Sequence, residues 1–292
     1  MNQKNAKPPL GQHFLKNNRA LSEIIAALEL KRGELVIEIG PGKGVLTVPL
    51  AEACKKVGCS LLAIEKDKAL AQELEQKLAT SNFPPGEDPP LEEKLEIVLG
   101  DVLKVLPSIV HDWKLPARQS LDAGGEIVNW KLVGNIPYYI TGTLLRTVSE
   151  LPQKPARTVL TVQREVAERI ISKPPRMNLL AAAVQIWASP EILMTLKPDD
   201  FSPPPKVDSA ILLLTTNDIQ RTTEEADYYY FFIRKLFKQP RKTTLNNIRS
   251  GYPKKTNGEI QKQLETHGIQ ENARPQDISM PVLIKLASYF SH

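Results

Sequence analysis

Short apolar runs alternate with amphipathic segments through the first 216 residues of this chain, and this alternation constrains its fold more than any other feature. The apolar runs have the length of buried strands, and they are Leu35–Ile39, Leu61–Ile64, Leu95–Leu99, Leu132–Gly134, Thr158–Val162, Ile192–Leu196 and Ala210–Leu214. Segments with helical periodicity separate most of them, at Ala20–Leu30, Val45–Lys56, Lys68–Leu78, Thr141–Glu150 and Arg164–Ile171. Such a β-α-β series predicts an α/β fold, with a largely parallel sheet that helices cover on both faces.

The strand pattern stops after about Thr216, and helical periodicity follows over Glu224–Phe237 and Asp277–Phe290. With 292 residues and 41% hydrophobic content, the chain can form one large core and a smaller one. We therefore expect a larger domain over residues 1–217 and a small all-α domain over residues 218–292. The stretches Ser81–Pro90 and His111–Asn129 are rich in Pro, Gly and polar residues, which is typical of surface insertions.

Composition disfavours several classes of protein. No apolar run is long enough to span a membrane, and the N-terminal stretch MNQKNAKPPLGQ has no signal-peptide core, so we expect a cytoplasmic protein. The two cysteines, Cys54 and Cys59, are too few for a zinc cluster or a disulfide framework. We expect reduced structural thiols and no metal site.

Positive charge is concentrated in two stretches of a chain whose net charge is only +5. No Asp or Glu lies between Tyr228 and Gly258, where the cations are Arg234, Lys235, Lys238, Arg241, Lys242, Arg249, Lys254 and Lys255. The segment before Glu23 also lacks acids and carries Lys4, Lys7, Lys16 and Arg19. Two such stretches favour a polyanionic partner such as nucleic acid, whose phosphates supply affinity without sequence information. An ordinary solvated surface is the alternative for either stretch alone.

A glycine-rich turn follows the first buried strand. Gly40 and Gly42, within EIGPGKG over residues 38–44, let the backbone turn tightly and approach a ligand closely. Glu65 ends the next strand and suits ribose hydroxyls, and Asp101 follows the third strand, where it can meet an adenine amine. The turn lacks the third glycine of a dinucleotide fingerprint, so S-adenosylmethionine, which has no pyrophosphate, fits better than a nicotinamide cofactor. For either acid alone, a helix cap or a solvated side chain is the alternative.

Asn135-Ile136-Pro137-Tyr138 supplies an amide, a backbone carbonyl and an aromatic face at the end of an apolar strand. The Asn135 side-chain oxygen and a carbonyl of the Ile136-Pro137 step can each accept an N–H of a planar amine, which polarises and aims that amine. Pro137 makes the turn rigid, and Tyr138 can stack on the ring. A strand-ending turn with a packed tyrosine is the competing explanation, and these four residues alone do not separate the two.

Several ordered motifs together resemble the rRNA adenine N6,N6-dimethyltransferases of the KsgA type. The motifs are LGQHFL at 10–15, EIGPGKG at 38–44, Glu65, Gly100-Asp101, Asn135 to Tyr138, QREVAER at 163–169, FSPPPKVDSA at 201–210 and Arg241-Lys242-Thr243. The resemblance implies a Rossmann-like, seven-stranded methyltransferase domain with a small helical C-terminal domain. It also implies S-adenosyl-L-methionine as cofactor and dimethylation of two adjacent adenosines near the 3′ end of small-subunit rRNA, within the immature small subunit.

The resemblance implies cofactor contacts from His13, Leu15, Gly40, Glu65, Asp101 and Asn135, to which the glycine turn adds Gly42. We expect direct methyl transfer, with Asn135 and Pro137 positioning the amine and with Tyr138 and Phe201 sandwiching the extruded base. A packed loop residue beside Pro203-Pro204-Pro205 is the alternative for Phe201. Candidate RNA contacts are Lys238, Arg241, Lys242 and Arg249, and we expect a monomer.

Three positions depart from the family pattern. His13 stands in place of a usual Asn, Met177-Asn178-Leu179-Leu180 replaces a usual Tyr-Gly-x-Leu, and Pro240 stands where a second basic residue is common. Two other functions are considered: a large-subunit rRNA adenine methyltransferase of the macrolide-resistance type, and a non-catalytic ribosome-assembly or transcription factor. The segments FSPPPKVDSA and RKT suit the small-subunit family better than the first, and intact Gly40, Glu65, Asp101 and Asn135 argue against the second.

Overall fold

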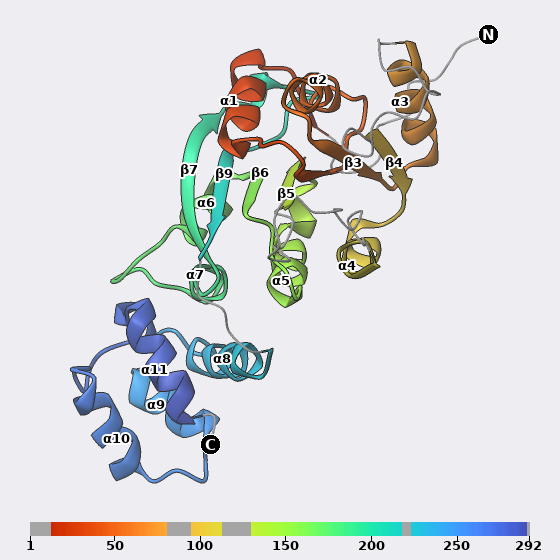
Figure 1. Ribbon diagram of the computed structural model, residues 1–292. Coiled ribbons are helices and arrows are strands. Elements are labelled where there is room, and N and C mark those ends of the chain that lie inside the picture. The colour runs from red at the N-terminus through yellow and green to blue at the C-terminus, as the bar shows by residue number, and fades with distance from the viewer. Residues whose placement is uncertain (1–12, 81–94, 113–129, 218–222, 291–292) are drawn as a thin grey trace. The chain divides into compact units, whose positions relative to one another are not determined.

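The structure is a computed structural model that describes residues 13–80, 95–112, 130–217 and 223–290 (Figure 1). The stretch Ser81–Pro90, most of His111–Asn129, and the basic residues Lys4 and Lys7 lie outside these ranges. The contacts of the chain divide it into two compact units, one made of residues 1–167 and 191–216 and the other of residues 168–190 and 217–292. The segment 168–190 therefore groups with the C-terminal helices.

The strands and helices follow the alternation of the sequence. The strands are β1 (Phe14–Leu15), β2 (Leu35–Ile39), β3 (Ser60–Glu65), β4 (Leu95–Leu99), β5 (Trp130–Asn135), β6 (Arg157–Gln163), β7 (Ala188–Leu196), β8 (Phe201–Ser202) and β9 (Ser209–Thr216). The α-helices are α1 (Asn18–Leu28), α2 (Thr47–Val57), α3 (Lys68–Thr80), α4 (Val102–Asp112), α5 (Thr141–Glu150), α6 (Arg164–Ile170), α7 (Leu179–Gln185), α8 (Thr223–Leu236), α9 (Thr244–Gly251), α10 (Asn257–Thr266) and α11 (Met280–Phe290). Short 3-10 turns cover Tyr138–Ile140, Pro198–Asp200 and Pro275–Asp277.

Seven of these strands form one sheet in the order β4-β3-β2-β5-β6-β9-β7. The strands from β4 to β6 are parallel, and β9 runs antiparallel to β6. The seven strands are those that the apolar runs predict, so the prediction of a largely parallel sheet is confirmed. Helices lie on both faces, with α1 and α2 on one side and α4 and α5 on the other (Figure 1).

The order of the strands in the sheet changes direction at β2, which is the topological switch point of the sheet. The strands β3 and β4 extend the sheet on one side of β2, whereas β5 pairs with its other side through Ile39 and Gly134. At such a switch point the connections after the two central strands diverge, and a crevice opens outside their carboxyl ends. The glycine turn after β2 and Asn135 at the end of β5 therefore lie side by side.

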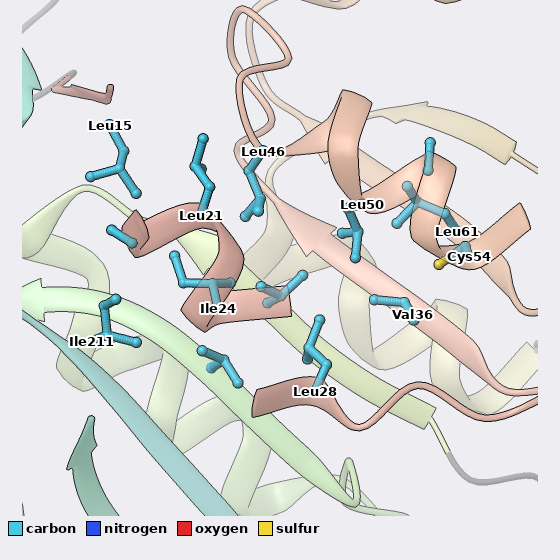
Figure 2. Close-up of a cluster of buried hydrophobic side chains, with 14 of the residues drawn as sticks. Leu15, Leu21, Ile24, Leu28, Val36, Leu46, Leu50, Cys54, Leu61 and Ile211 are labelled. Atoms are coloured by element: carbon cyan, nitrogen blue, oxygen red, sulfur yellow. The ribbon is translucent and has the colours of Figure 1, made fainter. Parts of the chain in front are cut away.

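One cluster of buried hydrophobic side chains in the first unit lies where α1 and α2 pack on the sheet. Leu21, Ile24 and Leu28 repeat at helical spacing and are buried, and Figure 2 shows them above the strands. Asn17 caps the helix by accepting the N–H of Ala20 at 3.1 Å. The same cluster contains Cys54 and Cys59, which are both buried and free.

The second unit is helical apart from the start of β7, and aromatic rings form much of its core. The rings of Phe232 on α8 and Phe290 on α11 stack with centroids 5.8 Å apart, and Tyr252 lies 5.2 Å from Phe290. The buried hydroxyl of Tyr229 donates to the carbonyl of Ala182 on α7 at 3.0 Å. Across the described ranges of both units, no helix is both long and apolar enough to cross a membrane.

Several elements were not expected from the sequence. The helix α4 contains Pro107, and because proline is unfavourable inside a helix, the local sequence does not predict this helix. The strand β7 continues through Pro190, which is tolerated because β7 lies at the edge of the sheet. The two-residue strands β1 and β8 pair with each other although they lie near opposite ends of the first unit in the sequence, so no local pattern predicts them.

Candidate active site

A pocket of about 410 Å³ opens at the carboxyl ends of the central strands. This volume is within the range of small-molecule sites. The predicted site residues that line it are His13, Leu15, Gly40, Gly42, Glu65, Asp101, Asn135, Pro137 and Tyr138. The structure thus brings together residues from four strand ends and from the N-terminal segment.

The glycine turn forms the floor of this pocket. Gly40 and Gly42 adopt φ values of 63° and 54°, a region that side chains disfavour. A Cβ on Gly42 would also lie 2.6 Å from the ring of Phe14, so a side chain at this position would displace that ring as well as strain the backbone. The Gly42 N–H donates to Oε2 of Glu65 at 3.0 Å, which ties the turn after β2 to the end of β3.

Glu65 is held in place by backbone donors. Its Oε1 accepts the N–H groups of Lys66 and Asp67 at 2.7 and 2.9 Å, while Oε2 accepts only the bond from Gly42 among the described residues. A carboxylate oxygen accepts two hydrogen bonds, so Oε2 keeps capacity for a ligand hydroxyl. Glu65 therefore holds the turn after β3 and can still accept a ligand hydroxyl, whereas Asp67 caps α3 by accepting the N–H groups of Ala69 and Leu70.

Asp101 likewise has both a structural and a pocket-facing role. Its Oδ1 accepts the Leu103 N–H at 3.1 Å and so caps α4, and its Oδ2 accepts a hydrogen bond from Lys66 at 2.8 Å. The hydrogen bond from Lys66 lowers the pKa of Asp101. Asp101 is therefore an ionised acceptor at neutral pH, and either of its oxygens can accept an N–H of an adenine amine.

Asn135 is oriented by the N-terminal segment. Its Nδ2 donates to the carbonyl of His13 at 2.6 Å, and because a carbonyl only accepts, this contact decides which end of the amide is nitrogen. The Oδ1 atom is left as the acceptor of the amide. His13 is itself held by its Nδ1, which donates to the carbonyl of Pro203 at 2.8 Å, and by the pairing of β1 with β8.

The ring of Tyr138 is fixed beside the pocket. Its hydroxyl lies 2.6 Å from Oγ of Ser209, and the ring of His13 lies nearly parallel to it with centroids 6.0 Å apart. Burial raises the pKa of Tyr138, while the hydrogen bond to Ser209 acts in the opposite direction. The phenol is therefore neutral at physiological pH and offers a ring face rather than a base.

Phe201 does not take part in the pocket. Its side chain is 1% exposed and packs in the hydrophobic cluster of the first unit. The pairing of β8 with β1 through Leu15 places this ring on the core side. A buried ring cannot stack on a base, so the predicted role of Phe201 does not agree with this structure. Phe201 is instead a packed residue, which was the alternative explanation.

Glu38 is a pocket residue that sequence reasoning did not select. It lies at the centre of the sheet on β2, is 1% exposed and lines the pocket. Its Oε2 has no hydrogen-bond partner among the described residues. Burial, with a smaller contribution from the Glu65 carboxylate, raises the pKa of Glu38 to about 8. An acid inside an otherwise apolar strand, directly before the glycine turn, was the available signal.

The four candidate RNA contacts belong to the second unit, where Lys238, Arg241, Lys242 and Arg249 are all exposed. The loop between α8 and α9, which carries three of them, is held by the buried side chain of Asn247. Its Nδ2 donates to the carbonyls of Gln239, Lys242 and Thr243 at 3.0, 3.3 and 3.1 Å, and its Oδ1 accepts the Gln239 N–H. The cations therefore project from an ordered loop.

Comparison with known proteins places the chain in a family. The family model described as "Ribosomal RNA adenine dimethylase" matches residues 3–291. The chain belongs to the ribosomal RNA adenine dimethylase family. A dimethyladenosine transferase from Plasmodium falciparum has a similar structure, with a TM-score of 0.70 and 22% identity over 95% of this chain and 97% of that one. The predicted Rossmann-like methyltransferase fold with a small helical C-terminal part is thereby confirmed.

Curated members of the dimethylase family are also similar in sequence. "Ribosomal RNA small subunit methyltransferase A" of Acidobacterium capsulatum is 34% identical over 283 residues, which cover 96% of this chain and 89% of that protein. The protein of the same name from Dehalococcoides mccartyi is 34% identical over 199 residues, which cover 68% of this chain. The match spans only 59% of the length of that relative.

The pocket suits the cofactor that a dimethylase of this family would use. Glu65 and Asp101 present oxygen acceptors at two adjacent strand ends, as the ribose and the adenine amine of S-adenosylmethionine need. The buried, unpartnered oxygen of Glu38 is an acceptor for a cationic group, and this cofactor carries an ammonium and a sulfonium. The carboxyl acceptors and the glycine turn therefore fit S-adenosylmethionine.

Proposed function

We propose that this chain is an S-adenosylmethionine-dependent enzyme that dimethylates the N6 amines of two adjacent adenosines near the 3′ end of small-subunit rRNA, and so acts in small-subunit biogenesis. The single observation that carries the proposal is the orientation of the Asn135 side chain. Its Nδ2 is bonded to the His13 carbonyl, so its Oδ1 is left to accept a hydrogen bond in the pocket, beside the glycine turn. The names of the curated relatives support the small subunit as the source of the RNA.

The residues of the chain position the amine. An adenine N6 lone pair is delocalised into the ring, so the amine must be aimed and polarised before it attacks an electrophile. Asn135 Oδ1 accepts one N–H and a backbone carbonyl of the Ile136-Pro137 step accepts the other, while Tyr138 stacks on the ring. When bound, S-adenosylmethionine supplies an electrophilic methyl group on a sulfonium that leaves readily. Catalysis by this chain is then mainly alignment.

Dimethylation requires the site to accept the amine a second time with one N–H fewer. Either acceptor, Asn135 Oδ1 or the backbone carbonyl, holds the remaining N–H. The neutral phenol of Tyr138 does not compete for the proton, which leaves to solvent. No side chain is assigned as a dedicated base.

Methyl transfer by Asn135→Ala tests the proposal. Unmethylated small subunits and radiolabelled cofactor are the substrates, and the modified bases are mapped. We expect the variant to lose transfer by at least about a hundredfold while cofactor binding stays measurable by calorimetry, because an alignment contact is removed from a largely preformed pocket. Asn257→Ala, an exposed asparagine at the start of α10, is the matched control. Full activity of Asn135→Ala would contradict the assignment.

The same assay separates this function from its alternatives. Methylation of large subunits alone would indicate the macrolide-resistance type of activity, and cofactor binding without transfer to either subunit would indicate a non-catalytic factor.

We also propose that residues 1–217 form the methyltransferase domain and residues 218–292 the RNA-contacting domain of a cytoplasmic monomer. The basic loop after α8 supports the assignment of RNA contacts to residues 218–292.

A further inference from the structure

The helix α8 carries two aromatic side chains that lie outside its buried face. Its buried face is made by Tyr229, Phe232, Ile233 and Leu236. Tyr228 and Phe231, three positions apart, are instead 40% and 54% exposed. Residues at this spacing share one side of a helix. A second aromatic stripe, outside the core, therefore runs along α8.

A lysine is fixed at the end of this stripe. The Nζ of Lys235 lies 4.6 Å from the ring centroid of Phe231 and 5.5 Å from that of Tyr252, and it donates to the carbonyl of Gly251 at 2.9 Å. Tyr252 meets Phe231 edge to face, with centroids 6.3 Å apart. We call Tyr228, Phe231, Lys235 and Tyr252 the α8 aromatic patch.

Charge around the α8 aromatic patch is polarised along the helix. Towards the N-terminus, Tyr228 donates to Glu224 at 3.1 Å and Asp227 is exposed. Towards the C-terminus, Arg234 and Lys238 are exposed, and no acid occurs in the sequence from Tyr228 to Gly258. A ligand that covers the patch and is itself an anion would extend toward the C-terminal end of α8.

We propose that the α8 aromatic patch is a stacking site for an unpaired base of RNA, with the adjoining phosphates on the side of Arg234 and Lys238. Exposed aromatic faces with nearby cations are the combination that binds single-stranded nucleic acid, because every base has a π face and every nucleotide a charge. This inference rests on the proposed function, since it takes rRNA as the partner, and it adds a binding site separate from the pocket.

A second copy of the chain is the competing occupant of the α8 aromatic patch. In a two-fold dimer with antiparallel α8 helices, the basic end of one helix would approach Glu224 and Asp227 of the other, and these charges attract. Lysine is depleted in protein interfaces, however, and Lys235 lies within the patch with Lys238 beside it. These cations favour a single-stranded polyanion.

The test uses the full chain without cofactor and a single-stranded oligouridylate that contains one 2-aminopurine, whose fluorescence falls when it stacks. The wild-type chain is expected to quench the probe, and Phe231→Ala to weaken binding at least about fivefold and to reduce the quenching, while any stacking on Tyr138 in the pocket remains. Phe231→Leu keeps an apolar side chain without a π face and should behave like Phe231→Ala, whereas Phe231→Trp should retain quenching. Circular dichroism confirms that each variant is folded.

Equal binding and quenching by the wild type and by both Phe231→Ala and Phe231→Leu would overturn the proposal. So would a concentration-dependent wild-type dimer in sedimentation equilibrium that Phe231→Ala dissociates, because the patch would then bind a second copy. Methyl transfer by the wild type to small subunits is measured separately. Absence of transfer would refute the proposed function, whereas transfer together with unchanged probe binding would refute only the stacking site.

Discussion

Glu38 has the least ordinary environment of any acid in the pocket. Burial raises its pKa to about 8, so at neutral pH most of the carboxyl groups are protonated. A cation placed beside the carboxyl favours its ionised form and lowers its pKa again. The ammonium of the cofactor is such a cation, and Glu38 would then change its protonation when the cofactor binds.

Glu38→Gln is expected to change how stability depends on pH. Between pH 4.5, the ordinary pKa, and about 8, folded Glu38 holds a proton that the unfolded chain has lost, so the free energy of unfolding falls as pH rises through this range. The slope is at most about 1.4 kcal/mol per pH unit, or about 5 kcal/mol in total. Urea unfolding at pH 5.5 and 7.5 should show the wild type losing more stability than the glutamine variant. Equal losses in the two proteins would contradict the assigned pKa.

At the scale of elements, the contact between β2 and β5 decides where the amide of Asn135 lies. Gly134 is opposite Ile39, and a Cβ on Gly134 would lie 2.6 Å from the Ile39 carbonyl oxygen. No side chain fits at this distance without moving one of the strands. The glycine therefore sets the separation of the two strand ends that form the floor and wall of the pocket.

Gly134→Ala is expected to destabilise the protein by about 1–3 kcal/mol and to weaken cofactor binding, because the strand must shift to relieve the overlap. Gly142→Ala is the matched control, since a Cβ on Gly142 in α5 has no atom within 4 Å. The control should be stabilised by about 0.5–1 kcal/mol. Thermal unfolding and calorimetric titration measure both effects, and a Gly134→Ala protein as stable as the control would refute this role of the strand contact.

At the scale of the whole molecule, charge is segregated along the chain. The basic loop after α8 is held by Asn247, so its cations keep a defined arrangement without an RNA partner. A preformed cationic loop loses less conformational entropy when it binds than a disordered one. We therefore expect the loop to contribute affinity through phosphates and not through base identity.

Replacing Lys238, Arg241 and Lys242 together by alanine should weaken RNA binding and flatten its salt dependence. If each cation contacts one phosphate of a single strand, the slope of log affinity against log salt changes by about 2. Filter binding of a small-subunit rRNA fragment over a range of salt concentrations measures this slope. Cofactor affinity should stay unchanged, because the loop lies outside the pocket residues.

A control with the same loss of charge separates contact from net charge. Lys56, Lys262 and Lys285 are exposed and lie outside the basic loop. Their joint replacement should leave the salt slope close to that of the wild type. Equal slopes for both triple variants would show that net charge, and not the loop, determines binding.

Much of the fold and of the pocket was predictable because the relevant signals are local. Each of the seven main strands contains a short, mostly apolar run. A parallel sheet gathers the residues that follow such strands at one edge, with no further information needed from the sequence. This is why Gly40, Glu65, Asp101 and Asn135 were selected and why they line one pocket. Their individual roles in binding stay predictions.

The sequence by itself determined which residue types stand at the strand ends, and hence the kind of ligand that the pocket accepts. Only the tertiary structure decided what surrounds them. Phe201 is buried because β8 pairs with β1, where Leu15 and Phe201 are 186 positions apart in the sequence, and Glu38 has an unpartnered oxygen because the sheet and the glycine turn enclose it. Burial and long-range pairing are properties of the packed chain, since they depend on segments that meet only after folding.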